Sequence, residues 1–84
     1  MAGAARDDAD FDAARTELGR RVRAARHVKG VSLETLAAGS SLHWTFVSRV
    51  ERGQGNLTLK SLLRLAAALG VDPGTLVKGL SIEK

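Results

Sequence analysis

The stretch Ser32–Gly53, SLETLAAGSSLHWTFVSRVERG, decides the fold of this 84-residue chain. Ser32 is a hydroxyl cap followed by an acid in the first turn, which predicts a helix that begins there and ends at Gly39-Ser40-Ser41. His43 is the expected cap of a second helix, which begins at about Trp44 and stops at Gly53, a residue that readily takes the left-handed conformation closing a helix. The stretch therefore predicts two short helices joined by a tight turn.

The residues before this stretch predict one long helix. Apolar residues recur there at spacings of three and four, which places them on one helical face; they are Phe11, Ala14, Leu18, Val22 and Ala25. The helix is expected to run from about Asp8 or Phe11 to Val28. Residues 1–10 are expected to form a flexible acidic arm, and residues 11–84 the folded domain.

Two more helices are expected after the stretch. The first opens at Thr58 and closes at Gly70, and the second starts at Asp72-Pro73, a cap followed by proline at the first helical position. The residues expected to be buried in the first of these are Leu59, Leu62, Ala66 and Leu69, with Leu63 and Leu65 flanking them. Five helices with no strand pattern predict an all-α, five-helix domain.

Charge is distributed unevenly along the chain, which carries a formal net charge of +4. Residues 1–19 hold five acids against two arginines, whereas residues 20–30 hold five basic residues and no acid. Basic charge on a small domain favours a polyanionic partner, although a solvated helix face accounts for a charge run equally well.

Composition argues against several classes of protein. There is no cysteine and there are only two histidines, so neither a metal cluster nor a thiol nucleophile is expected. No apolar run is long enough to cross a bilayer. We therefore expect a cytoplasmic protein with no enzyme activity, no metal, no cofactor and no membrane partner.

The second short helix carries a polar face. Thr45, Ser48, Arg49 and Arg52 follow the spacing i, i+3, i+4 and i+7, so they share one side, opposite apolar valines. Arginine, serine and threonine hydrogen-bond to base edges and phosphates. This pattern predicts a helix-turn-helix whose second helix enters the major groove of double-stranded DNA.

Trp44 has two interpretations that the sequence leaves open. The ring either packs against the preceding helix or a dimer partner, or it makes apolar contacts with thymine methyl groups.

Four segments together resemble the XRE family of helix-turn-helix regulators, which is Cro-like and lambda-repressor-like. They are LGRRVRAAR (18–26), SLETLA (32–37), S-x-V-E-R-G (48–53) and NLTLKSLLRLAAALGV (56–71). The segments LHWTFVSRVERG and NLTLKSL are most similar to the small controller proteins of restriction–modification systems. This resemblance implies a homodimer that binds a palindromic operator and regulates transcription.

The resemblance also implies roles by position. Bases would be read by His43, Trp44, Thr45, Ser48 and Arg49. Phosphates would be held by Ser32, Arg52, Gln54 and Asn56. Arg26 and Glu51 fall on a pair that commonly forms a buried salt bridge.

Four positions depart from the family pattern. Leu33 replaces a polar residue that contacts phosphate, and Trp44 and Gly55 stand where controller-like relatives often have arginine. Ser41 stands where the turn usually has glycine, and Gly39 is expected to relieve the backbone there instead.

The last helix is the expected dimer interface, through Leu76, Val77 and Leu80; ordinary burial of these residues within the domain is the alternative. The rival to a DNA-binding regulator is a protein-interaction module, such as an antitoxin or a regulatory subunit, with Trp44 and the acidic arm as its best support.

Overall fold

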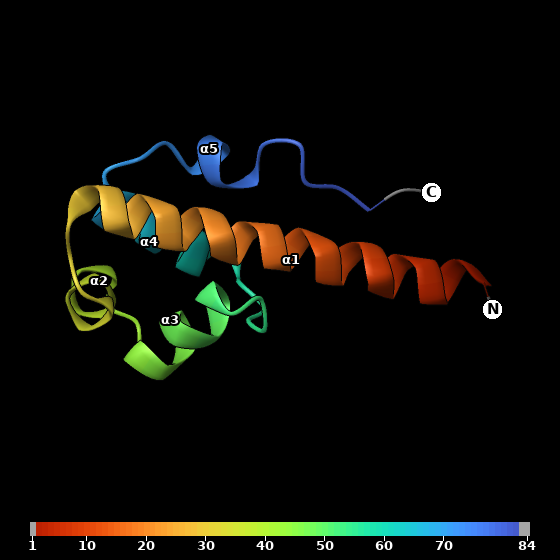
Figure 1. The fold of residues 1–84 in the computed structure, drawn as a ribbon, viewed down its shortest axis with the longest axis horizontal. Coiled ribbons are helices and arrows are strands. Elements are labelled where there is room, and N and C mark those ends of the chain that lie inside the picture. The colour runs from red at the N-terminus through yellow and green to blue at the C-terminus, as the bar shows by residue number, and fades with distance from the viewer. Residues whose placement is uncertain (1, 83–84) are drawn as a thin grey trace.

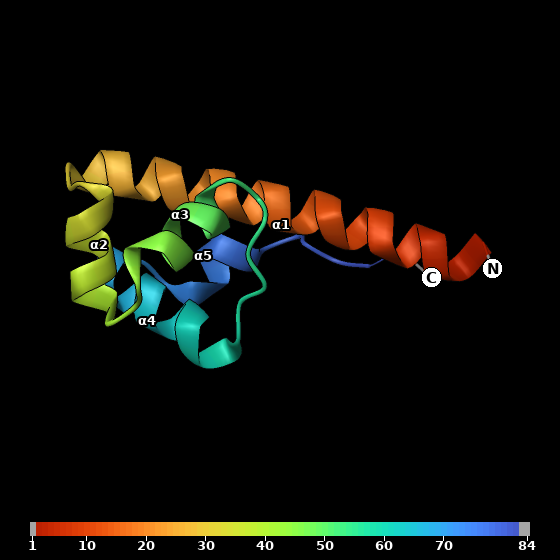
Figure 2. The same ribbon diagram turned by 90° about the horizontal axis from the view of Figure 1, so that it is seen from below.

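A long first helix forms one side of the molecule, and three of the four shorter helices pack against it (Figures 1 and 2). The computed structural model describes residues 2–82, with side chains from Asp7 onward. Its helices are α1 (Ala2–Lys29), α2 (Leu33–Ser40), α3 (Trp44–Glu51), α4 (Leu59–Leu69) and α5 (Pro73–Val77). No strand occurs within residues 2–82, so the predicted all-α, five-helix fold is confirmed.

The expected start of the first helix was wrong. Residues 2–10, expected to be a separate arm, are helical and continue directly into the rest of α1. The reason is local, since alanines are frequent in this segment and favour the helix strongly. The N-terminal end of α1 consequently projects beyond the other helices, as Figure 1 shows. Met1 of the expected arm, and Glu83 and Lys84 at the other end, lie outside the described residues.

Side-chain caps begin the four short helices, as the sequence predicted. The Ser32 and Thr58 hydroxyls accept hydrogen bonds from the amides of Thr35 and Ser61, both at 3.1 Å. The His43 ring accepts from the Thr45 amide at 3.2 Å, and the Asp72 carboxylate accepts from the Gly74 amide at 2.9 Å. Each cap satisfies an amide that the helix itself leaves without a partner, and so fixes where the helix begins.

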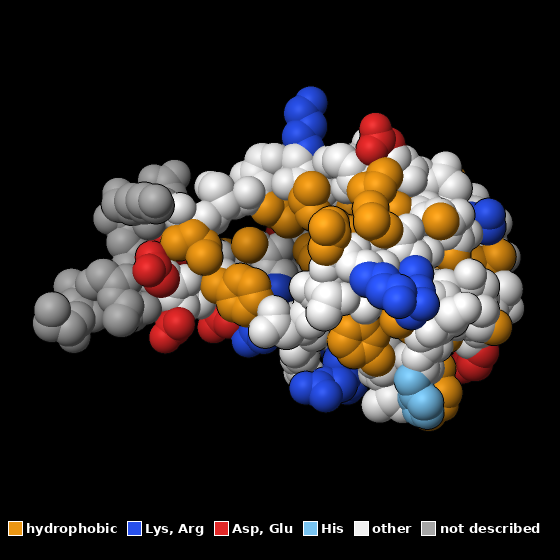
Figure 3. Space-filling view, turned by 180° about the vertical axis from the view of Figure 1, so that it is seen from behind, with side chains coloured by type: hydrophobic (Ala, Val, Ile, Leu, Met, Phe, Trp, Pro, Cys, Tyr) orange, Lys and Arg blue, Asp and Glu red, His pale blue; other side chains and the backbone are white. Residues whose placement is uncertain are grey.

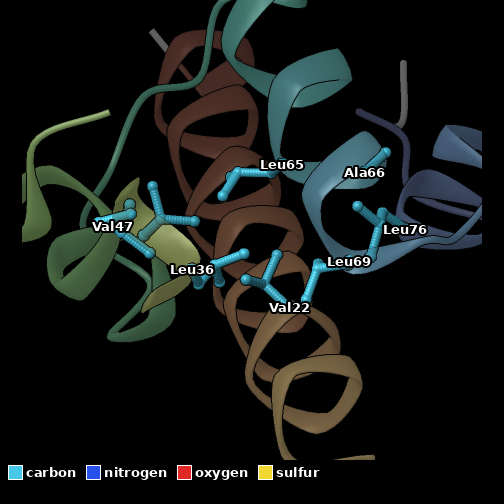
Figure 4. Close-up of a cluster of buried hydrophobic side chains, with 9 residues drawn as sticks. Val22, Leu36, Val47, Leu65, Ala66, Leu69 and Leu76 are labelled. Carbon is cyan, nitrogen blue, oxygen red and sulfur yellow. The ribbon is translucent and has the colours of Figure 1, made fainter. Parts of the chain in front are cut away.

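The hydrophobic core lies where α1, α2, α3 and α4 meet, with α5 closing one side (Figure 4). Its buried members are Val22, Leu36, Ala37, Val47, Val50, Leu65, Ala66, Leu69 and Leu76. Of the apolar positions predicted for the first helix, Leu18, Val22 and Ala25 lie in or against this cluster, and Phe11 and Ala14 line a pocket beside it.

The predicted orientation of α4 was partly wrong. Leu65, expected to flank the core, is fully buried, whereas Leu59, expected inside, is 71% exposed. Packing against both α1 and α2 turns the middle and end of α4 inward, and Leu59 in the first turn lies beyond that contact. The sequence could not fix this orientation because leucines occur on almost every side of the helix.

Leu76 was assigned to a dimer interface and is instead part of the core. Its side chain is only 2% exposed, so it has almost no apolar area left for a second chain. Val77 and Leu80 retain exposed or partly exposed side chains.

No helix among the described residues is both long and apolar enough to span a bilayer.

Candidate nucleic-acid interface

The turn between α2 and α3 depends on an unusual serine. Ser41 has φ of 57°, in the left-handed region, and is the only non-glycine residue with positive φ among those described. Its amide bonds back to the carbonyls of Ala37 and Ala38 and closes α2. Gly39 lies inside α2 and has no positive φ, so the expectation that it relieves the turn was wrong. The left-handed position is fixed by the hydrogen bonds that end the helix.

The turn presents α3 with one face inward and one outward. Val47 and Val50 are buried, so they fix the rotation of the helix. The residues expected to read bases lie away from them; His43, Trp44, Thr45 and Arg49 are exposed and Ser48 is half-buried. The structure thus places all five on an accessible surface, most of them near the N-terminal end of α3.

Trp44 lies on this outer surface and not in the core. Its side chain is 53% exposed, and its ring stacks on that of His43 with a centroid distance of 6.2 Å. Since His43 Nδ1 accepts from the Thr45 amide, the neutral ring carries its proton on Nε2. The cap therefore leaves His43 with an outward N–H donor beside an exposed indole.

The expected phosphate-binding residues are all exposed, but they are not equally available. The Ser32 hydroxyl accepts from the Thr35 amide and donates to Thr35 Oγ1 at 2.9 Å, so it is already engaged in capping α2. Arg52 Nε donates to the Ser48 carbonyl at 3.4 Å, and this bond does not use its two terminal nitrogens, which can still bind a phosphate. Gln54 and Asn56 have exposed side chains on the loop that follows α3.

An ion pair ties the end of α3 to α1. Arg26 Nε donates to Glu51 Oε2 at 2.6 Å and its Nη2 donates to Glu51 Oε1 at 2.9 Å, so the expected salt bridge forms and is bidentate. The two side chains are 13% and 8% exposed. Hydrogen bonding to Glu51 raises the pKa of Arg26, so its guanidinium is charged at every ordinary pH.

Most of the basic run in α1 is not free to bind a polyanion. Arg20 and Arg21 both bind the Glu17 carboxylate, and Arg26 binds Glu51. Glu17 lies outside residues 20–30 but only one helical turn before them. Residues 20–30 therefore carry less unpaired positive charge than their composition alone suggests.

Two glycines make close contacts that the sequence analysis did not predict. A Cβ at Gly19, in the middle of α1, would lie 2.2 Å from the Val50 carbonyl oxygen. A Cβ at Gly55 would lie 2.6 Å from Val50 Cγ2. These glycines let α1 and the following loop approach the end of α3 closely. A glycine inside a helical pattern was the available signal, because it lowers helix stability unless packing requires it.

No group of three histidines, acids or cysteines within the described part of the chain is placed to hold a metal.

Comparison with known proteins agrees with this geometry. Residues 17–78 match the helix-turn-helix domain family, and the chain belongs to that family. Among its relatives is the control protein C.SmaI of Serratia marcescens, 39% identical over 69 residues, which are 80% of this chain and 82% of the relative. Another is the control protein C.BamHI of Bacillus amyloliquefaciens, 40% identical over 60 residues, covering 70% of this chain and 74% of the relative.

A solved structure is similar as well. The restriction–modification controller protein C.AhdI from Aeromonas hydrophila superposes with a TM-score of 0.75 and 45% identity, over 76% of this chain and 97% of that one. The resemblance read from the sequence motifs is confirmed. The chain is a helix-turn-helix regulator similar to controller proteins, and these relatives favour DNA binding over the protein-interaction alternative.

Proposed function

We propose that this protein is a controller-type transcriptional regulator, without enzyme activity, that binds a palindromic operator as a homodimer. The observation that carries the proposal is α3, whose buried valines hold an exposed row of hydrogen-bonding side chains at its N-terminal end. Two such helices, one from each protomer, would enter successive major grooves about 34 Å apart.

Each exposed group has a definite role in this proposal. Arg49 binds a guanine edge, His43 donates from Nε2, and Trp44 packs on a thymine methyl group. Thr45 and Ser48, whose hydroxyl side chains are short, donate further hydrogen bonds to the same base pairs. Outside the groove, Arg52 and the amides at the start of α2 bind phosphates, since helix N-termini favour anions.

A second copy of the chain would meet the first through α4 and α5. Leu59, Leu63 and Val77 are exposed by 71%, 46% and 36%, and we call this set the α4–α5 surface. Figure 3 shows hydrophobic side chains gathered over these helices with Lys and Arg side chains beside them. An apolar patch of this kind on a small protein favours association, and a twofold axis through it would relate the two recognition helices.

Selection of bound sequences from a random duplex library tests the proposal directly. The expected result is an enriched palindrome, whose binding the Arg49→Ala variant weakens most at one base position of each half-site. Binding should also weaken by about 10³ or more between 50 and 200 mM salt if six phosphates are contacted. Failure of the wild type to enrich any sequence would refute the proposal.

A further inference from the structure

The middle of α1 packs against the loop that follows the recognition helix. Residues 11–16 precede the segment that matches the family domain, which begins at residue 17. They nevertheless lie beside the loop Gly53–Leu57, which carries two of the proposed phosphate-binding side chains, Gln54 and Asn56. This part of α1 thus has a place in the site that the family match does not explain.

Thr16 and Gly53 form the tightest of these contacts. Gly53 has φ of 74°, and a Cβ there would lie 2.9 Å from both Cα and Oγ1 of Thr16. The Thr16 hydroxyl is itself fixed, because it donates to the Asp12 carbonyl at 2.8 Å. The loop therefore begins directly on the surface of α1.

Arg15 holds the next residue of the loop. Its Nη1 donates to the Gln54 carbonyl at 3.5 Å, and its Nη2 pairs with Asp12 Oδ1 at 2.7 Å. Its guanidinium carbon lies 5.2 Å from the centre of the Phe11 ring, a cation–π distance. Asp12 and Phe11 thereby fix the guanidinium that touches the loop.

Phe11 and Leu18 also line an apolar pocket of about 150 Å³, together with Ala14, Arg15, Gly55, Asn56, Leu57 and Leu80. On the other side of the loop, Gly55 rests on Val50 of α3. The backbone from Gly53 to Leu57 is consequently held between α1 and the end of the recognition helix. Figure 2 shows this loop running between α3 and α4 beside α1.

We propose that Phe11 and Arg15 are positioning residues for DNA binding, which hold Gln54 and Asn56 ready to contact phosphates. A loop that became ordered only on DNA would lose conformational entropy at that moment and bind more weakly. The inference rests on the proposed function, since it needs DNA as the ligand. Phe11 is partly buried and lines the pocket beneath the loop, and it has no group that could bind a phosphate. An effect of its removal on DNA affinity is therefore expected to act through the loop.

A double-mutant cycle on the selected operator tests this role in the full-length chain. Phe11→Ala should weaken binding about fivefold to tenfold in the wild-type background, and less than about twofold when Gln54 and Asn56 are already alanine. Phe11→Leu should restore most of the affinity. An equal loss in both backgrounds, or no loss in either, would overturn the proposal.

Val71→Ala is the matched control. Val71 is also partly buried and packs on the core from the connection between α4 and α5, away from the pocket. It should lower the thermal midpoint to a similar extent and leave the affinity for DNA unchanged. If it weakens DNA binding as much as Phe11→Ala does, loss of stability explains both and the positioning role is refuted.

Amide hydrogen exchange in the free protein separates this inference from the proposed function. Phe11→Ala should speed exchange at Gln54, Gly55 and Asn56 by about fivefold or more and leave α2 unchanged. If the wild type binds no duplex, the proposed function and the DNA-positioning role both fail, whereas exchange still reports whether Phe11 orders the loop. If the wild type binds DNA but loop exchange is unchanged, only the positioning role fails.

Discussion

Ser41 closes α2 with its backbone amide, and it does so in a left-handed conformation that strains the backbone of a residue with a Cβ. Its left-handed conformation closes α2 and aims the chain at α3, yet its Cβ disfavours that conformation. We expect Ser41→Gly to stabilise the fold by about 1 kcal/mol, because relief of strain exceeds the added flexibility of glycine in the unfolded chain. Urea unfolding measures this, with DNA affinity expected to stay the same. A lower midpoint would mean that the serine is not strained.

The Arg26–Glu51 pair stabilises the end of the recognition helix. Glu51→Ala leaves a nearly buried guanidinium without its partner, which typically costs about 3–5 kcal/mol. The expected result is a large drop in the denaturant midpoint without a change in slope. The double variant Arg26→Met with Glu51→Leu should be more stable than Glu51→Ala, because it removes both charges. An unfolding curve for Glu51→Ala that matches the wild type would contradict this account.

Trp44 is exposed enough to separate binding from stability. We expect Trp44→Ala to change the free energy of unfolding by less than about 0.5 kcal/mol, as for most surface substitutions. Binding to the selected operator should fall by about tenfold or more, whereas binding to unrelated duplex falls less. Parallel melting and DNA titration check both expectations. A large loss of stability with unchanged specificity would assign the indole to packing.

At the scale of elements, a network on α1 holds the segment that ends α5. Arg21 Nη1 donates to the carbonyls of Leu76 at 3.2 Å and Lys78 at 2.7 Å, and its Nε donates to Glu17 Oε2 at 2.8 Å. Glu17 also binds Arg20 through both of its oxygens. Glu17 therefore orients the arginine that joins α1 to the C-terminal part of the chain.

This network predicts a pH dependence. Hydrogen bonds from Arg20 and then Arg21 lower the pKa of Glu17 from 4.5 to about 2. Because the folded pKa is depressed, the stabilisation by Glu17 is complete above pH 4.5 and is lost as the pH falls through about 2. The midpoint difference between wild type and Glu17→Gln should be constant near neutral pH and shrink toward pH 2. A difference independent of pH would exclude the charge of Glu17 as the cause.

At the scale of the whole molecule, the α4–α5 surface and the outer face of α3 are separate. We expect Leu63→Glu to leave the helical content unchanged and to raise the dimer dissociation constant by about tenfold or more, since it places charge in an apolar contact. Sedimentation over a dilution series measures this. Operator binding should weaken with it, because both half-sites must be occupied together.

Val28→Glu is the control for that experiment. Val28 is 90% exposed near the end of α1, outside the α4–α5 surface, so the same kind of change there should not alter association. A wild type that is monomeric at all micromolar concentrations would defeat the dimer proposal. Equal weakening by both variants would show that added charge, and not the surface, is responsible.

The sequence by itself determined where the four short helices begin. Caps at Ser32, His43, Thr58 and Asp72 are local signals, since each side chain bonds an amide only two or three residues away. The outward face of α3 also followed from spacing alone. Val47 and Val50 fall on one side of this short helix, and Thr45, Ser48, Arg49 and Arg52 fall on the other.

Only the tertiary structure decided the features that depend on distant residues. The orientation of α4 and the burial of Leu76 depend on which neighbours they pack against, and leucines on almost every side of a helix do not specify that. The close approach of Gly19 to the end of α3 and the hydrogen bond from Arg15 to the loop likewise join segments far apart in the chain. The Ser32–Gly53 sequence therefore specifies a recognition helix, whereas its neighbours in space determine how firmly that helix and its loop are held.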